Sequence, residues 1–197
     1  MADVVIVGVG GQGTILASKL LAQAALLEGR SVRTAETIGM AQRGGSVLGH
    51  VRVRAPHEGV FSPLVPVGQA DLLIGFEPGE TVRALGYLRE GGSVVTAKRA
   101  LVPLSATAYD GTAELAYLSA CAESGRIDRL ALVDGQAATA KLGNPRVLNV
   151  VLLGAALATA GLDIPQTTFE RAIELLVRPG FVEVNKQALA LLSPGKR

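Results

Sequence analysis

Cysteine and histidine, the residues most used for metal and redox chemistry, are nearly missing from this chain. Its 197 residues include one cysteine, Cys121, and two histidines, His50 and His57. One cysteine cannot form a disulfide within the chain, and it cannot supply a four-cysteine iron–sulfur or zinc site. The sequence therefore predicts no metal centre. Cys121, inside a helical stretch, is interpreted as a small buried apolar residue.

Charged and aromatic residues are also scarce. They make up 18% and 4% of the chain, there is no tryptophan, and the formal net charge is +2. Nucleic-acid-binding proteins use basic patches and aromatic stacking platforms, so this composition argues against a nucleic-acid partner. No basic segment opens the chain, and the longest apolar stretch, 147–162, is too short to span a membrane. We therefore expect a cytoplasmic protein with no membrane partner.

Hydrophobic residues, in contrast, reach 49%, near the top of the usual range. A chain of this length can bury roughly 70% of its unfolded surface, so we expect one domain over residues 1–197, closed by helices from about residue 145. The apolar excess and the apolar helix expected at 145–161 predict that another chain covers part of the surface.

Short apolar runs alternate with helical stretches along most of the chain. Strands are expected at 4–7, 31–36, 46–54, 70–76, 93–97 and 130–133, with short extended pieces at 59–61 and 101–104. Helices are expected at 13–28, 77–89, 112–124, 135–142, 145–161, 166–177 and 182–192. The first strand, helix and second strand form a βαβ unit. This alternation predicts an α/β fold with a three-layer, largely parallel Rossmann-like sheet and C-terminal helices.

A glycine-rich turn directly follows the first expected strand. It consists of Gly8, Gly10, Gly11, Gln12 and Gly13 around Val9. Its glycines fit G-x-G-x-x-G between a strand and a helix, which is the context that a dinucleotide-binding turn requires. The free N–H groups of the helix start favour an anion. No lysine follows the last glycine, so the turn is not a Walker A loop.

Three interpretations of this turn stay open from its spacing. It could hold a dinucleotide, with Glu36 at the end of the second strand on a ribose hydroxyl. Its glycines could instead only permit close packing of strand and helix. The third interpretation is a contact loop for another subunit or for that subunit's cofactor.

A second glycine-rich segment follows the second strand, and its notable residues are Gly39, Gln42, Arg43, Gly44 and Gly45. Functional loops gather at the carboxyl ends of parallel strands, so both segments are expected at one edge of the sheet. Arg43 could bind a carboxylate or phosphate, or form a surface salt bridge. An ordinary dinucleotide fold does not need this second segment, so it favours the contact-loop interpretation.

No catalytic group stands out. No serine lies in a G-x-S-x-G turn, and no pair of carboxylates has a context that favours acid–base chemistry. His50 lies on the polar face of the strand at 46–54 and is interpreted as a strand residue at an interface, not as a catalyst. The catalytic residues are therefore unknown, and the chain is interpreted as one part of a larger complex.

Together these segments resemble the small subunit of 2-oxoacid:ferredoxin oxidoreductases, closest to the indolepyruvate type. The resemblance rests on G-V-G-G-Q-G at 8–13 and E-T-I-G-M-A-Q-R-G-G-S-V at 36–47, with H-V-R at 50–52. It continues through A-D-L-L at 70–73, F-E-P at 76–78, G-N at 143–144, and Asn149 to Asn185. It thus spans nearly the whole chain, and the second segment is its most specific part.

The resemblance implies an enzyme that couples oxidative decarboxylation of a 2-oxoacid, such as indolepyruvate or pyruvate, to reduction of ferredoxin, with coenzyme A as co-substrate. Thiamine diphosphate and iron–sulfur clusters are expected in a larger catalytic partner, and no cofactor is expected on this chain alone. Both glycine-rich segments would face the partner's active site, with Gln42 and Arg43 as polar contacts. The competing hypotheses are a stand-alone NAD(P)- or flavin-binding oxidoreductase that uses Glu36, and an assembly module whose glycines only pack.

Overall fold

The computed structural model describes residues 2–39, 45–59, 62–102, 108–160 and 162–192. Its strands are β1 (Ala2–Val9), β2 (Ser31–Ile38), β3 (Ser46–Arg54), β4 (Ala70–Gly75), β5 (Leu88–Ala97) and β6 (Ile127–Val133). Its α-helices are α1 (Thr14–Leu27), α2 (Pro78–Ala84), α3 (Thr112–Glu123), α4 (Gly135–Lys141), α5 (Leu148–Ala160), α6 (Gln166–Leu176) and α7 (Val182–Ala190). Short 3-10 helices are η1 (Leu85–Tyr87), η2 (Pro145–Val147) and η3 (Pro179–Phe181).

The described strands form one mixed sheet with the order β2-β3-β1-β4-β5-β6. The pairs β1–β4, β4–β5 and β5–β6 are parallel, whereas β3 is antiparallel to both β1 and β2. The expected α/β fold with a largely parallel sheet is confirmed. The expected βαβ unit is only partly right, because β3 folds back as a hairpin from β2 and takes the place beside β1.

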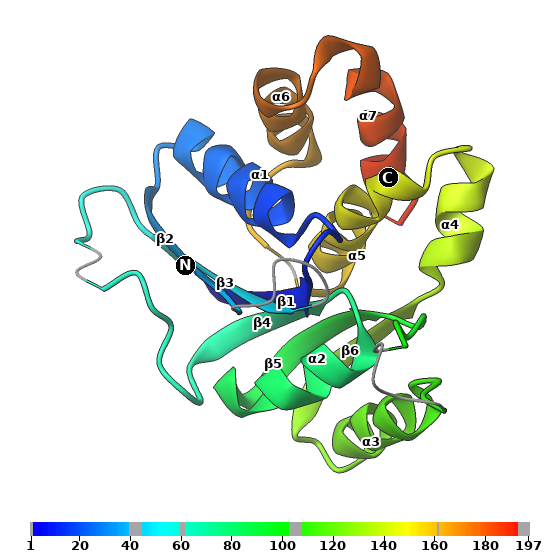
Figure 1. Cartoon of the computed structure of the whole chain (residues 1–197). Coiled ribbons are helices and arrows are strands. Elements are labelled where there is room, and N and C mark those ends of the chain that lie inside the picture. Colours follow the sequence, from blue (N-terminus) through cyan, green and yellow to red (C-terminus); the bar gives the residue numbers. More distant parts are fainter. Residues whose placement is uncertain (1, 40–44, 60–61, 103–107, 161, 193–197) are drawn as a thin grey trace.

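Helices cover both faces of the sheet (Figure 1). On one face α1 and α5 pack against the strands, with α6 and α7 outside them, and the large core cluster lies there. On the other face α2 and α3 enclose a smaller cluster that includes Cys121, which is buried as expected. Successive residues of β1 and β4 alternate between the two clusters, because side chains of a strand point to opposite faces. This explains their continuous apolar runs.

Two expected boundaries were wrong around Gly91 and Gly92. The helix expected at 77–89 ends at Ala84, and the next strand begins at Leu88 and runs through both glycines. The β5–β6 register shifts between Gly92 and Ser93, which marks a bulge. A Cβ on Gly92 would lie 2.6 Å from Leu88 Cδ1. Glycine therefore permits this bend inside a strand, where the sequence pattern had predicted a break.

The apolar helix expected to face a partner is instead the centre of this chain's own core. Every residue of α5 from Asn149 to Leu157 is buried, between the sheet and the helices α1 and α7. Its hydrophobic composition therefore reflects packing within the chain. None of the described helices combines the length and the apolar character needed to cross a membrane. The piece expected at 59–61 and the piece expected at 101–104 each lie partly outside the described residues, and residues 101–102 form no strand.

Candidate functional site at the carboxyl edge of the sheet

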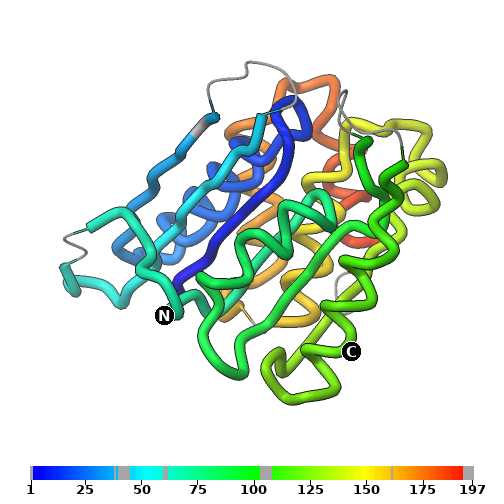
Figure 2. The backbone as a smooth tube through the Cα atoms, turned by 60° about the horizontal axis from the view of Figure 1, so that its bottom comes forward, coloured from blue at the N-terminus to red at the C-terminus, as the bar shows by residue number. Residues whose placement is uncertain are grey.

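The two glycine-rich segments meet at one edge of the sheet. The carboxyl ends of β1 and β2 and the start of β3 lie together there, at the top of Figure 2. The Gly10 N–H donates to the Gly45 carbonyl at 2.8 Å, and the Gly39 N–H donates to the Ser46 carbonyl at 2.9 Å. The expectation that both segments share an edge is therefore confirmed for the described glycines. Gln42, Arg43 and Gly44 lie outside the described residues.

The Gln12 side chain bridges the ends of two neighbouring strands. Its Oε1 accepts a hydrogen bond from the Val9 N–H at 2.7 Å, and its Nε2 donates to the Phe76 carbonyl at 3.0 Å. The helix after β1 lies on one face of the sheet and the helix after β4 on the other. The crevice between two such strands is where ligands bind in open α/β sheets. Here a side chain of the protein itself spans that crevice.

Two glycines of the first turn, Gly8 and Gly13, are required by close packing. A Cβ on Gly8 would lie 2.8 Å from both Gln12 Oε1 and Phe76 Cβ, closer than real contacts allow. Gly13 has a φ of 89°, and a Cβ there would lie 3.0 Å from Asn149 Nδ2. A side chain at either position would push on a buried neighbour.

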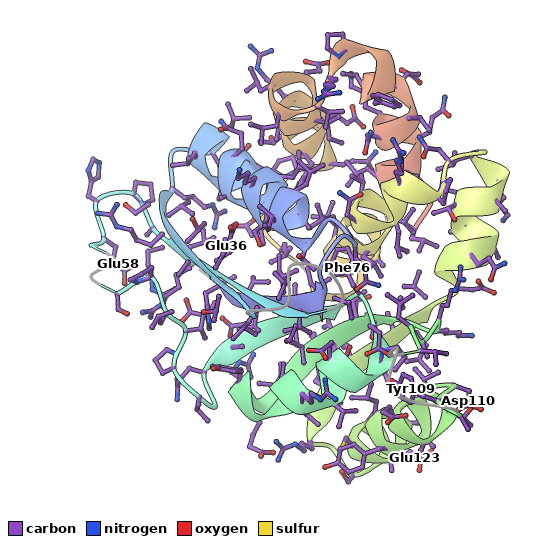
Figure 3. The ribbon with its side chains drawn as sticks, viewed as in Figure 1. Glu36, Glu58, Phe76, Tyr109, Asp110 and Glu123 are labelled. Carbon is purple, nitrogen blue, oxygen red and sulfur yellow. The ribbon has the colours of Figure 1, made fainter. Side chains whose placement is uncertain are left out.

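The dinucleotide interpretation fits this geometry poorly. Three amides of the turn, those of Val9, Gly10 and Gln12, already donate within the protein. Glu36 pairs with Gly49 of β3, so β3 separates it from β1. Two strand spacings amount to roughly 10 Å, and Figure 3 shows Glu36 on β2, well away from Phe76 at the end of β4. The acidic residue is displaced by one strand from the place that a ribose contact requires.

Two buried carboxylates lie directly beneath this edge, just after β4. Glu77 is 3% exposed, and its Oε2 accepts the Glu80 N–H at 2.9 Å, which caps the start of α2. Its Oε1 accepts from the Tyr109 hydroxyl at 2.6 Å. Glu80 is 6% exposed and accepts from the Ser46 hydroxyl at 2.5 Å and from the Arg83 guanidinium. Both carboxylates therefore tie other segments to the end of β4.

Tyr109 is the donor in its bond to Glu77. Burial, and then the hydrogen bond to the Glu77 carboxylate, raise the pKa of the Tyr109 hydroxyl. The phenol therefore keeps its proton over the physiological range and remains a donor. Figure 3 places Tyr109 near the start of α3, next to Asp110, so this contact joins the connection after β5 to the connection after β4.

A hollow of about 410 Å³ opens beside the bridging glutamine. Gln12, Phe76 and Arg99 line it from the strand ends, and residues of α4 and η2 line it from the opposite side. Arg99 is exposed, and within the described part of the chain it forms no ion pair. The hollow combines apolar walls with one cation, which suits a ligand or partner segment of mixed character.

His50 lies inside this chain's own fold. It is 2% exposed, its Nδ1 accepts the Val65 N–H at 3.2 Å, and its ring meets the edge of Tyr87 at 5.5 Å between centroids. Burial lowers the pKa of His50, which favours the neutral ring that this bond needs. It therefore holds the segment before β4 onto β3. Among the described residues, no three His, Cys, Asp or Glu side chains gather as metal ligands would.

Several residues of this edge are not among the site residues predicted from the sequence, although two of them lie in the strings that carry the family resemblance: Ser46, Glu77, Glu80, Arg99 and Tyr109. Only the two glutamates left a local signal, because an acidic residue before Pro78 and another three positions later is typical of a helix start. Ser46 and Tyr109 reach this site through contacts 34 and 32 residues apart in the sequence. No local pattern encodes such distant contacts.

The fold and the carboxyl edge of the sheet thus define a mixed α/β protein whose glycine-rich segments meet at the carboxyl ends of its strands. Residues 3–191 match the family described as pyruvate ferredoxin/flavodoxin oxidoreductase, and the chain belongs to this family. The family resemblance carried by the glycine-rich segments is thereby confirmed.

Individual relatives agree with this assignment. The chain is 36% identical over 190 residues to the indolepyruvate oxidoreductase subunit IorB of Thermococcus kodakarensis, with 96% of this chain and 93% of the relative covered. It shares its fold with the gamma subunit of a keto/oxoacid ferredoxin oxidoreductase from Geobacter sulfurreducens (TM-score 0.69, 23% identity, 97% and 95% covered). It also matches part of the 2-oxoglutarate:ferredoxin oxidoreductase of Magnetococcus marinus (TM-score 0.68, 17% identity, 98% and 31% covered).

Proposed function

We propose that this chain is the small, non-cofactor subunit of a thiamine-dependent 2-oxoacid:ferredoxin oxidoreductase, with residues 1–197 as a single gamma-type domain. Its substrate in the complex is indolepyruvate or another arylpyruvate. The observation that carries the proposal is the 36% identity to an indolepyruvate oxidoreductase subunit over 96% of the chain. Thiamine diphosphate and the iron–sulfur clusters belong to a larger catalytic partner, which performs the oxidative decarboxylation and passes electrons to ferredoxin.

The carboxyl edge of the sheet is the surface that we assign to the partner's active site. Loops at this edge carry function in open α/β proteins, and the Gly10–Gly45 hydrogen bond brings both glycine-rich segments together there. We assign ten residues to this surface: Gly8, Gly10, Gly11, Gln12, Gly13, Gly39, Gln42, Arg43, Gly44 and Gly45. Their role is to shape the approach to the reacting centre.

Protein groups suited to binding coenzyme A, the acyl acceptor, lie at the same edge. Gly13 caps α1 without a side-chain hydrogen bond, so first-turn amides of this helix are not satisfied by a cap. Such amides and the helix dipole favour an anion such as a phosphate. Arg99 adds an exposed guanidinium nearby. When bound, coenzyme A supplies the thiol that accepts the acyl group, and this chain's part is to bind and orient it.

Reconstitution tests the proposal. The chain and its catalytic partner are purified separately and together, and reduction of ferredoxin is followed with indolepyruvate, pyruvate or 2-oxoglutarate in the presence of coenzyme A. We expect a stable complex whose turnover is fastest with indolepyruvate and far above that of either component alone. A chain that binds no partner and adds nothing to 2-oxoacid-dependent electron transfer would refute the proposal.

A further inference from the structure

Three connections at the carboxyl edge are fastened to one short segment, residues 76–80, which we call the anchor segment. The turn after β1 is bound through Gln12, whose Nε2 donates to the Phe76 carbonyl at 3.0 Å. The hairpin between β2 and β3 is bound through the Ser46 hydroxyl on Glu80. The connection after β5 is bound through the Tyr109 hydroxyl on Glu77. The anchor segment is therefore the common reference for loops from three different strands.

Capping of α2 by Glu77 engages only one of the four carboxylate oxygens of the anchor segment. This segment buries two carboxylates that are only 3% and 6% exposed. Glu80 has the Arg83 guanidinium as an ionic partner, but Arg83 is 74% exposed, and within the described residues Glu77 forms no ion pair. Burying a carboxylate is costly even when it is hydrogen-bonded, and an apolar replacement of similar volume is often equally or more stable.

These carboxylates fix the positions of the hydroxyl groups that donate to them. A carboxylate oxygen fixes the position of a hydroxyl donor more strictly than apolar packing does, because its hydrogen bonds are short and charge-assisted. Ser46 lies next to Gly45, whose carbonyl receives the Gly10 N–H. The Glu80–Ser46 bond therefore adds a side-chain restraint where the chain enters β3, beside the ladder pairing of Ser46 with Val9, and it does so next to the junction of the two glycine-rich segments. Polar groups that break the rules of core packing are expected where function needs fixed geometry.

We propose that the anchor segment is a positioning device for the partner's reaction, and that Glu77 and Glu80, through Tyr109 and Ser46, are its positioning residues. This inference rests on the proposed function. The side chains act through the loops that they hold, and they do not touch the substrate. Loosening one bond should therefore leave assembly intact and lower the rate of the catalytic complex.

The test uses the reconstituted complex and two variants that each remove one hydroxyl, Ser46→Ala and Tyr109→Phe. For each variant, kcat and KM for the 2-oxoacid and for coenzyme A are measured from ferredoxin reduction. Partner binding and thermal unfolding are recorded in parallel. We expect kcat to fall roughly tenfold in both variants, the scale of one lost hydrogen bond to a charged group, with partner binding unchanged.

Two matched variants complete the design. Ser46→Thr keeps the hydroxyl and should restore kcat to within about twofold of the wild type. Arg83→Ala removes the exposed partner of the same Glu80 carboxylate and should also stay within about twofold. Wild-type kinetics in either hydroxyl variant, or a variant that no longer assembles, would overturn the inference. A wild-type complex without turnover on any 2-oxoacid would instead refute the proposed function, and this inference with it.

Discussion

Replacing Gly8 by alanine tests whether the first turn is built for close packing. The added Cβ would lie 2.8 Å from Phe76 Cβ and 2.8 Å from Gln12 Oε1. Phe76 is fully buried, and because the contact is to its Cβ, a change of side-chain rotamer cannot relieve it. Gln12 can swing aside, but its hydrogen bonds to the Val9 amide and the Phe76 carbonyl are then lost.

The magnitude follows from these two costs. Overpacking of a tight site costs about 1–3 kcal/mol, and each lost hydrogen bond costs about 1 kcal/mol. We therefore expect Gly8→Ala to lower the free energy of unfolding by roughly 2–5 kcal/mol, which for a chain of this size lowers Tm by roughly 5–15 °C. Urea denaturation followed by circular dichroism measures the first quantity, and calorimetry measures the second.

Two other glycines serve as matched controls. Gly11 has a φ of 99° with no atom within 4 Å of an added Cβ, so Gly11→Ala should cost only the backbone strain, about 1–2 kcal/mol. Gly86 has open space and no positive φ, so Gly86→Ala should change stability by less than about 0.5 kcal/mol. If Gly8→Ala is no more destabilising than Gly86→Ala, the packing argument is refuted.

Three further predictions follow from the same structure. Asp3→Asn should lower the free energy of unfolding by about 2–3 kcal/mol, because it leaves the Arg52 and Arg54 guanidiniums, 17% and 18% exposed, without their shared carboxylate. As a control, Arg89→Ala breaks an exposed ion pair and should lower the free energy of unfolding by less than about 1 kcal/mol. Burial holds the pKa of His50 in the folded chain below its unfolded value of 6.5. The unfolded chain therefore binds more protons between those two values, so the free energy of unfolding should decline as pH falls below 6.5. Denaturation measured from about pH 8 to about pH 5 checks this, and a decline equally steep in His50→Gln would contradict it. Glu36→Ala should leave turnover of the complex unchanged, and saturable binding of NADH or a flavin by the isolated chain, weakened by this substitution, would restore the dinucleotide interpretation.

Local sequence patterns were sufficient to predict most helices and strands of the chain. Continuous apolar runs mark strands that are buried on both faces, and β4 begins at the residue where the sequence predicts it. The alternation in 46–54 gives β3 its bounds and its two faces. The glycine-rich turns also locate the functional edge, since the carboxyl ends of parallel strands must lie together.

The order of the strands in the sheet could not be predicted from those patterns. Periodicity tells which face of a strand is buried, but it carries no information about which strand lies beside it. Only the folded sheet shows that β3 lies between β1 and β2, and this insertion moves Glu36 away from the glycine-rich turn. The apolar character of α5 was equally ambiguous, because a helix covered by its own chain and one covered by a partner have the same composition.

The α/β class, the two glycine-rich segments and their family follow from the amino-acid sequence alone, because these depend on local periodicity and on short strings of residues. Only the folded chain shows how the groups of the first turn are bound. The Val9, Gly10 and Gln12 amides and the Gln12 side chain donate or accept hydrogen bonds within the protein, and the Phe76 carbonyl and the Glu77 and Glu80 carboxylates bind groups from three other connections. Hydrogen bonds between groups more than 30 residues apart form only when the chain is folded, so their convergence could be seen only in three dimensions.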